Sequence, residues 1–282
     1  MRFGILVALL LSIVLTGCFG TSGISLSKGN YDIEPPPSIH GAMRHIGKND
    51  STRIAIASFG AGKSKRFAGR IHNDSQRAGA NDNIELPEMD GQITYNLPML
   101  SYFCEWRDIY GTDQGNEWGA GFGVFPYPYV HLFGAINTSI SEVGAFALLN
   151  ASIESVDYEG VAVEAPGTYR DYELGDYDDS PRNVHETDRL VLRGNAEIGA
   201  FLNFFIKDFT LSYVPSVYFP WLFWNDLGEY NTTFFYPMLL MHEFQVGYNI
   251  SKWNVGLAFR DVVSNKLSGN YWQVRLNVAY YF

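Results

Sequence analysis

Residues 271–282 read YWQVRLNVAYYF, and this stretch indicates the fold class. Every second residue is apolar, and most of the residues between them are polar. Successive side chains of a β-strand point to opposite faces, so the alternation predicts a strand with two unlike faces. The apolar face is large and aromatic at both ends, which is typical of a strand that faces lipid and not of one that faces a soluble core. This face consists of Trp272, Val274, Leu276, Val278, Tyr280 and Phe282.

The same alternation recurs in earlier segments, whose opposite face is polar or Gly. We therefore predict an all-β protein, an antiparallel up-and-down transmembrane β-barrel of about eight strands. Ten strands is the alternative, because one segment alternates poorly. The eight segments are 92–106 (the irregular one), 118–136, 142–155, 190–206, 208–220, 236–249, 252–263 and 271–282.

The connections between these segments alternate in length. Barrels of the outer membrane have short periplasmic turns and longer outer loops, so we place the short connections and the C-terminus in the periplasm. The short connections are 137–141, 207–208 and 250–251, and the others are 107–117, 156–189, 221–235 and 264–270.

The polar face of the segments carries charges that would point into the lumen. Eight strands enclose a lumen that side chains fill, so these charges must pair with one another. We interpret them as a solid ionic plug, with a narrow pore or a small ligand site as the alternative. The candidates for this network are Arg275, Arg260, Glu243, Arg193 and Glu197.

Residues 1–17 have the layout of a secretory signal, with Arg2, an apolar run and small residues. The tetrapeptide Leu15-Thr16-Gly17-Cys18 resembles the lipobox of bacterial lipoproteins. The resemblance implies that Cys18 becomes an acylated mature N-terminus, and Phe19 in place of Asp implies delivery to the outer membrane. A plain signal peptide with an incidental Cys is the alternative. Cys104 would then lack a partner, and we expect it to be buried as a small hydrophobe.

The last strand also resembles a known signal. In bacterial outer-membrane β-barrels a final strand ends on an aromatic residue, and here Val278, Tyr280 and Phe282 carry the resemblance. Both resemblances imply lipoprotein-processing and barrel-assembly machinery as partners, together with outer-membrane lipid.

Residues 18–91 read as a basic, mostly irregular periplasmic tether in front of a barrel at 92–282. Residues 35–37 are Pro-Pro-Pro, which suits a semi-rigid linker. Residues 57–64 fit a relaxed P-loop pattern, but no apolar stripe of helical spacing follows them, so we expect no nucleotide. The 282-residue chain has a formal charge of −10, which argues against nucleic acid. We expect no cofactor.

Three functions are compatible with these features. The first is a non-enzymatic structural or surface-interaction barrel with an acidic outer loop at 156–189. The second is a small-barrel lipid-modifying enzyme that uses a strand histidine, His131 or His242, although neither shows a catalytic triad. The third is a soluble periplasmic glycan-binding β-sandwich lipoprotein. Within the acidic loop, a weak candidate site for a hard cation is formed by Asp176, Asp178 and Asp179.

Overall fold

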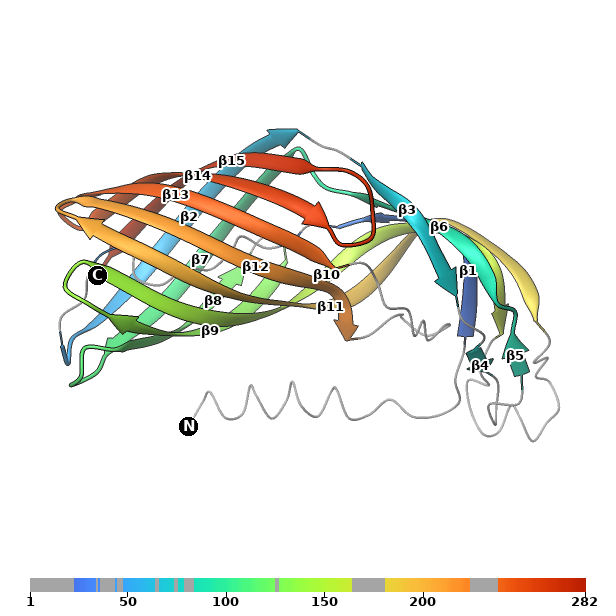
Figure 1. Cartoon of the computed structure of the whole chain (residues 1–282), viewed down its shortest axis with the longest axis horizontal. Helices are drawn as coiled ribbons and strands as arrows, with labels where there is room; N and C mark the ends of the chain where they lie inside the picture. Colours follow the sequence, from blue (N-terminus) through green and yellow to red (C-terminus); the bar gives the residue numbers. More distant parts are fainter. Residues whose placement is uncertain are drawn as a thin grey trace.

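The fold is that of a computed structural model of the whole chain (Figure 1). The structure describes residues 23–33, 35, 44, 48–63, 66–73, 76–78, 84–124, 127–163, 181–223 and 238–282. These residues form fifteen strands. Within these ranges, no helix is long and apolar enough to cross a membrane.

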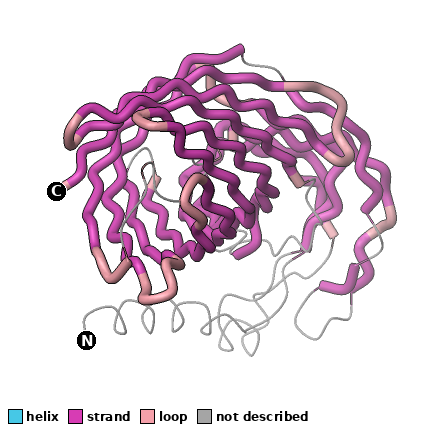
Figure 2. The backbone as a smooth tube through the Cα atoms, turned by 60° about the vertical axis from the view of Figure 1, so that its left-hand side comes forward, coloured by secondary structure: helices cyan, strands magenta, loops and turns pink. Residues whose placement is uncertain are grey.

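Ten of the strands form one closed antiparallel barrel, which confirms the predicted fold class with the larger of the two strand numbers (Figure 2). Closure comes from the last strand, which pairs with the first barrel strand from Tyr281↔Ile54 to Trp272↔Lys63. A two-sheet sandwich is therefore excluded. In order round the ring the strands are β2 (Ser51–Lys63), β7 (Leu100–Gly111), β8 (Glu117–Val124), β9 (Pro128–Asn137), β10 (Ser141–Val163), β11 (Arg182–Ile206), β12 (Phe209–Phe223), β13 (Leu239–Ile250), β14 (Trp253–Ser264) and β15 (Tyr271–Tyr281).

Two differences from the sequence prediction turn eight strands into ten. The segment 118–136 is not one strand but two, β8 and β9, separated at residues 125–127. The barrel also begins at residue 51, inside the stretch expected to be a tether. In β2 the lumen side includes Ile54 and Ile56, while the outer side has the small residue Ala at three positions. The usual contrast between the two faces is therefore missing, and the alternation was invisible in the sequence. The P-loop-like residues from Ala57 to Lys63 belong to this strand.

The two ends of the barrel differ in their connections. Residues 112–116, 138–140, 207–208 and 251–252 join strands at one end, which we call the turn end. Three of the four are the short turns expected from the sequence. The first, expected among the outer loops as part of 107–117, lies at the turn end because 118–136 is two strands. The opposite end, the loop end, carries all the longer connections.

At the loop end, β10 and β11 extend beyond the barrel and pair with further strands. There the far half of β10 pairs with β1 (Gly23–Asp32), which runs parallel to β6 (Met89–Asn96), and β6 pairs with β3 (Arg66–Asn73). We call β1, β3, β6 and the far halves of β10 and β11 the extension. Two short strands, β4 (Gln76–Ala78) and β5 (Ile84–Leu86), pair beside it. In Figure 1 these strands bend away from the direction of the barrel strands.

An apolar band surrounds the barrel. On β10 the exposed side chains Val143, Leu149 and Ile153 lie on the outer face. Val143 and Ile153 are ten residues apart. This separation corresponds to about 25 Å of height at roughly 3.3 Å per residue and a tilt of about 40°, which is the height of the lipid-facing band of outer-membrane barrels.

Aromatic pairs line the outer surface toward the turn end. The ring centroids of Tyr110 and Trp118 lie 4.6 Å apart, and those of Trp253 and Tyr280 lie 4.8 Å apart. Phe282 is exposed, and its centroid lies 5.1 Å from that of Trp106. Amphipathic rings at this position are typical of a membrane interface.

The exposed surface becomes polar where the extension begins. Beyond Ile153 the side chains of β10 include Asp157 and Glu159, and Glu159 pairs with Lys28 of β1 at 3.3 Å. The Asp188 N–H and the Asn30 amide both donate to the carboxylate of Asp157, at 2.8 and 3.1 Å. These two hydrogen bonds lower the pKa of Asp157 from its usual value of 3.8. The extension therefore presents a surface suited to water, next to a barrel wall suited to lipid.

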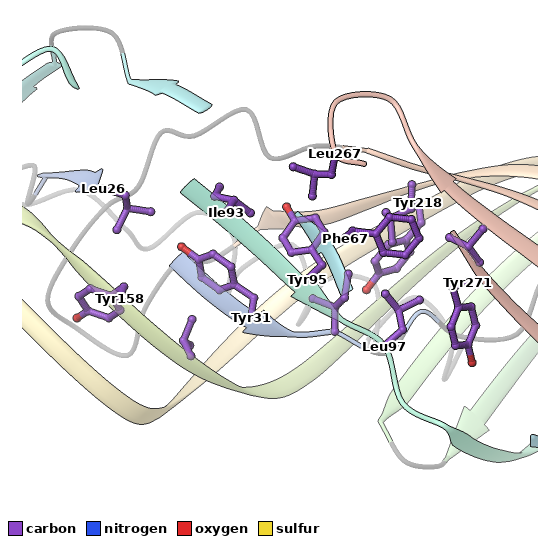
Figure 3. Packing of buried hydrophobic residues seen from close by; sticks show 14 of the residues in the cluster. Leu26, Tyr31, Phe67, Ile93, Tyr95, Leu97, Tyr158, Tyr218, Leu267 and Tyr271 are labelled. Carbon is purple, nitrogen blue, oxygen red and sulfur yellow. The ribbon is translucent and has the colours of Figure 1, made fainter. Parts of the chain in front are cut away.

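The inner face of the extension covers the mouth of the barrel (Figure 3). Side chains from β1, β3 and β6 form one buried cluster with lumen-facing residues of the barrel strands. The Tyr271 hydroxyl of β15 donates to the carbonyl of Pro98 at 3.0 Å, and the rings of Tyr31 and Tyr95 meet edge to face at 6.1 Å. The cluster includes Leu26, Tyr31, Ile33, Phe67, Ile93, Tyr95, Leu97, Tyr218, Met241, Val262, Leu267 and Tyr271.

Candidate functional site

Three charged residues predicted to share the lumen make direct contact there. Glu243 of β13 is fully buried and accepts a hydrogen bond from Arg260 Nε at 3.1 Å. The same carboxylate oxygen accepts a second hydrogen bond, from Arg275 of β15. Register explains the first contact, since Glu243 lies directly opposite Arg260 on the neighbouring strand. One carboxylate thus serves two buried guanidinium groups.

The other two predicted network residues are also buried, on β11. Arg193 is 4% exposed, and its guanidinium carbon lies 5.2 Å from the ring centroid of Tyr31. Glu197 is fully buried. The Arg193 contact joins the barrel lumen to β1 of the extension by a cation–π interaction.

A second polar cluster in the lumen was not predicted from the sequence. Glu105 of β7 accepts hydrogen bonds from Arg107 Nε at 2.6 Å and from the Tyr129 hydroxyl at 2.8 Å. His131 Nε2 lies 3.0 Å from the same carboxylate. Gly121 lies opposite His131 and makes room for its ring. The alternation of polar and apolar residues did not reveal this cluster, because the lumen face of β7 also carries apolar residues and its two faces look alike.

The lumen is therefore more apolar than an ionic plug. A buried cluster of aromatic and aliphatic side chains, Phe103, Tyr129, Phe133, Phe146 and Phe201 among them, surrounds the Glu105 group. A ten-stranded barrel has a wider lumen than an eight-stranded one, and large rings fill the additional space.

The turn-end mouth of the lumen is also occupied. Tyr281 is 1% exposed, and the guanidinium carbon of Arg44 lies 3.9 Å from its ring centroid. Arg44 Nη1 also donates to the carbonyl of Ser251, in the turn between β13 and β14, at 3.3 Å. On the wall nearby, the Asn203 amide donates to Glu142 at 2.6 Å.

The two strand histidines lie in different environments. His131 faces the lumen, whereas a lipid-modifying site requires its histidine at the lipid-facing surface. His242 faces outward as the sequence indicated, and its Nδ1 lies 2.9 Å from the Tyr213 hydroxyl of β12. The rings of Tyr213 and His242 stack with their centroids 6.2 Å apart. The contact satisfies a polar ring on an otherwise apolar face.

Cys104 is exposed, which corrects the expectation that it would be buried. It occupies an outward position of β7, so it is covered by lipid and not by protein. Among the side chains that the structure describes, no group of three or more His, Cys, Asp or Glu residues is arranged to hold a metal. Cys18 and the acidic cluster Asp176, Asp178 and Asp179 lie outside the described residues.

The barrel-terminal residues lie at the end of β15. Val278 and Tyr280 alternate along β15, and the N–H of Phe282 donates to the carbonyl of Arg53 at 3.0 Å. This backbone hydrogen bond therefore joins Phe282 to the first barrel strand, β2.

Comparison with known proteins adds three structural likenesses. No family model matches the chain, and no curated protein matches it. The outer membrane protease OmpT from Escherichia coli aligns at 12% identity with a TM-score of 0.36, covering 82% of this chain and 97% of that one. The translocator domain of the autotransporter NalP from Neisseria meningitidis aligns at 11% identity with a TM-score of 0.36, covering 85% of this chain and 91% of that one. The KdgM porin aligns at 10% identity with a TM-score of 0.30, covering 78% of this chain and 99% of that one. At such TM-scores, the assignment of the fold rests on the chain's own closed ring of strands.

Proposed function

We propose that the chain is an outer-membrane protein of a Gram-negative bacterium, a sealed barrel that holds a β-sheet at the cell surface for non-enzymatic contact. The observation that carries the proposal is the extension. Two barrel strands, β10 and β11, continue beyond the apolar band, and β1 and β6 join them in one sheet with a polar outer face. A barrel that served only to enclose a pore has no need for this second structure.

The contents of the lumen support a sealed barrel. The loop end is covered by the apolar cluster beneath the extension, the middle holds the Glu243 pairs, and Tyr281 with Arg44 occupies the turn end. Large side chains thus fill the described lumen at three successive levels. Pairing also compensates the buried charges, which would otherwise be too costly to leave in the lumen.

Membrane attachment has two parts in this proposal. The apolar band places the barrel in the bilayer, and acylation of Cys18 adds a lipid anchor. Each buried methylene contributes about 0.8 kcal/mol, so three acyl chains hold a protein almost permanently. The support for acylation is the lipobox-like sequence before Cys18.

Planar-bilayer recording of the refolded protein tests whether the barrel lumen conducts ions. We expect no steady conductance above that of the bare bilayer, with a general porin as the positive control. Gel mobility that changes on boiling establishes that the recorded sample is a folded barrel. A stable ohmic channel in such a sample would replace the proposal with a transport function.

A further inference from the structure

The position of β1 determines where the beginning of the chain lies. Gly23 pairs with Val163 and Tyr31 with Val156, so β1 runs from the far tip of the extension back toward the barrel. Its partner positions lie beyond Ile153, where the apolar face of β10 ends. The whole of β1 is therefore outside the band, at the loop end.

The described residues that follow β1 lie at both ends of the barrel. Ile33 is buried in the cluster at the loop end, and its N–H donates to the carbonyl of Asn96 at 2.9 Å. Arg44 stacks on Tyr281 at the turn end, and the carbonyl of Asp50 accepts a hydrogen bond from Gly111 N–H there. Ile33 thus fixes the end of β1 at the loop end, on the opposite side of the barrel from Arg44.

The reach of the chain before β1 is short. Cys18 precedes Gly23 by five residues. Even fully extended, they span at most roughly 18 Å at about 3.6 Å per residue. A lipid-facing band is about 25 Å tall. A residue tethered to Gly23 at the loop end therefore cannot place acyl chains in the leaflet at the turn end.

The extension bends away from the direction of the barrel strands. Figure 1 shows the labelled part of β1 running across that direction. A strand that lies across the barrel axis runs along the membrane surface. Its first residue is then beside the outer leaflet, within reach of a short lipid-bearing segment.

We infer that the acylated Cys18 is anchored in the outer leaflet, at the cell surface. The inference rests on the acylation in the proposed function and adds the leaflet to it. It reverses the expectation from the sequence, in which the lipid lies in the inner leaflet and residues 18–91 lie in the periplasm. Lipid and barrel then hold the extension from two sides.

Two exposed serines provide a matched pair for testing the side of the membrane. Ser27 lies on β1, and Ser251 lies in the turn between β13 and β14. Ser27→Cys and Ser251→Cys are each made in a Cys104→Ser background, and intact cells are treated with a membrane-impermeant maleimide. We expect Ser27→Cys to be labelled completely, with no increase on permeabilisation. Ser251→Cys should be labelled only after permeabilisation.

Mass spectrometry of the N-terminal peptide from the same cells separates the two proposals. Acylated Cys18 together with surface labelling at Ser27→Cys supports the inference. Acylated Cys18 with labelling at Ser27→Cys only after permeabilisation overturns the leaflet assignment and leaves the lipid anchor standing. An N-terminus without lipid overturns both the anchor and the inference.

Discussion

Replacing Glu243 by Gln tests whether the barrel depends on its buried ion pairs. Glu243 is fully buried, and the side chains of Arg260 and Arg275 are 4% and 3% exposed. The substitution preserves shape but removes the carboxylate charge that both guanidinium groups contact. Removal of one partner from a buried pair costs about 3–5 kcal/mol. That loss corresponds to a roughly 100- to 4,000-fold change in the unfolding equilibrium constant.

Urea unfolding in detergent micelles, followed by tryptophan fluorescence, measures this loss. The matched control is Glu159→Gln, which removes a carboxylate of the same type from an exposed pair with Lys28. Exposed pairs contribute about 0–1 kcal/mol, so the control should unfold close to the unmodified protein.

A second substitution separates charge from packing. Arg275→Gln added to Glu243→Gln removes one of the two guanidinium groups that lost this carboxylate, so we expect it to restore part of the lost stability. If Glu243→Gln unfolds with the Glu159→Gln control, within about 1 kcal/mol, then the lumen is not a low-dielectric interior and the barrel is not sealed.

Three further predictions concern the wall and the extension. Gly121→Ala places its Cβ in steric overlap with the His131 ring at Nε2, whereas in Gly134→Ala the nearest atom is 4.0 Å away. We expect the first to lose about 1–3 kcal/mol and the second to be neutral, and equal unfolding midpoints would contradict this. A lowered pKa means that the Asp157 carboxylate stabilises the extension above about pH 4, and this contribution disappears as the pH falls through the lowered value. The protection factors of the β1 amides, which correct hydrogen exchange for its intrinsic pH dependence, should therefore fall on acidification, less so in Asp157→Asn, and an identical fall in both would exclude this role. A nitroxide attached to Cys104 before refolding into vesicles should be relaxed by oxygen and not by a water-soluble nickel chelate; the reverse pattern would place this face in water.

Alternation of side chains was sufficient to predict the barrel and much of its lumen. It is a local property, because neighbouring side chains of a strand face opposite ways whatever the strand pairs with. The sequence therefore determined the outward face of β15 and the inward position of Arg260, Arg275 and Glu243. Where the two faces were alike in polarity, as in β2, the pattern did not reveal the strand.

Only the tertiary structure determined which strands pair with one another. β1 finds its antiparallel partner in β10, more than one hundred residues away, and no pattern within residues 23–32 specifies that choice. The Glu105 cluster depends in the same way on β7 and β9 both pairing with β8, which lies between them. Hydrogen bonding between distant strands, and not periodicity, placed residues of the expected tether in a barrel strand and in the extension.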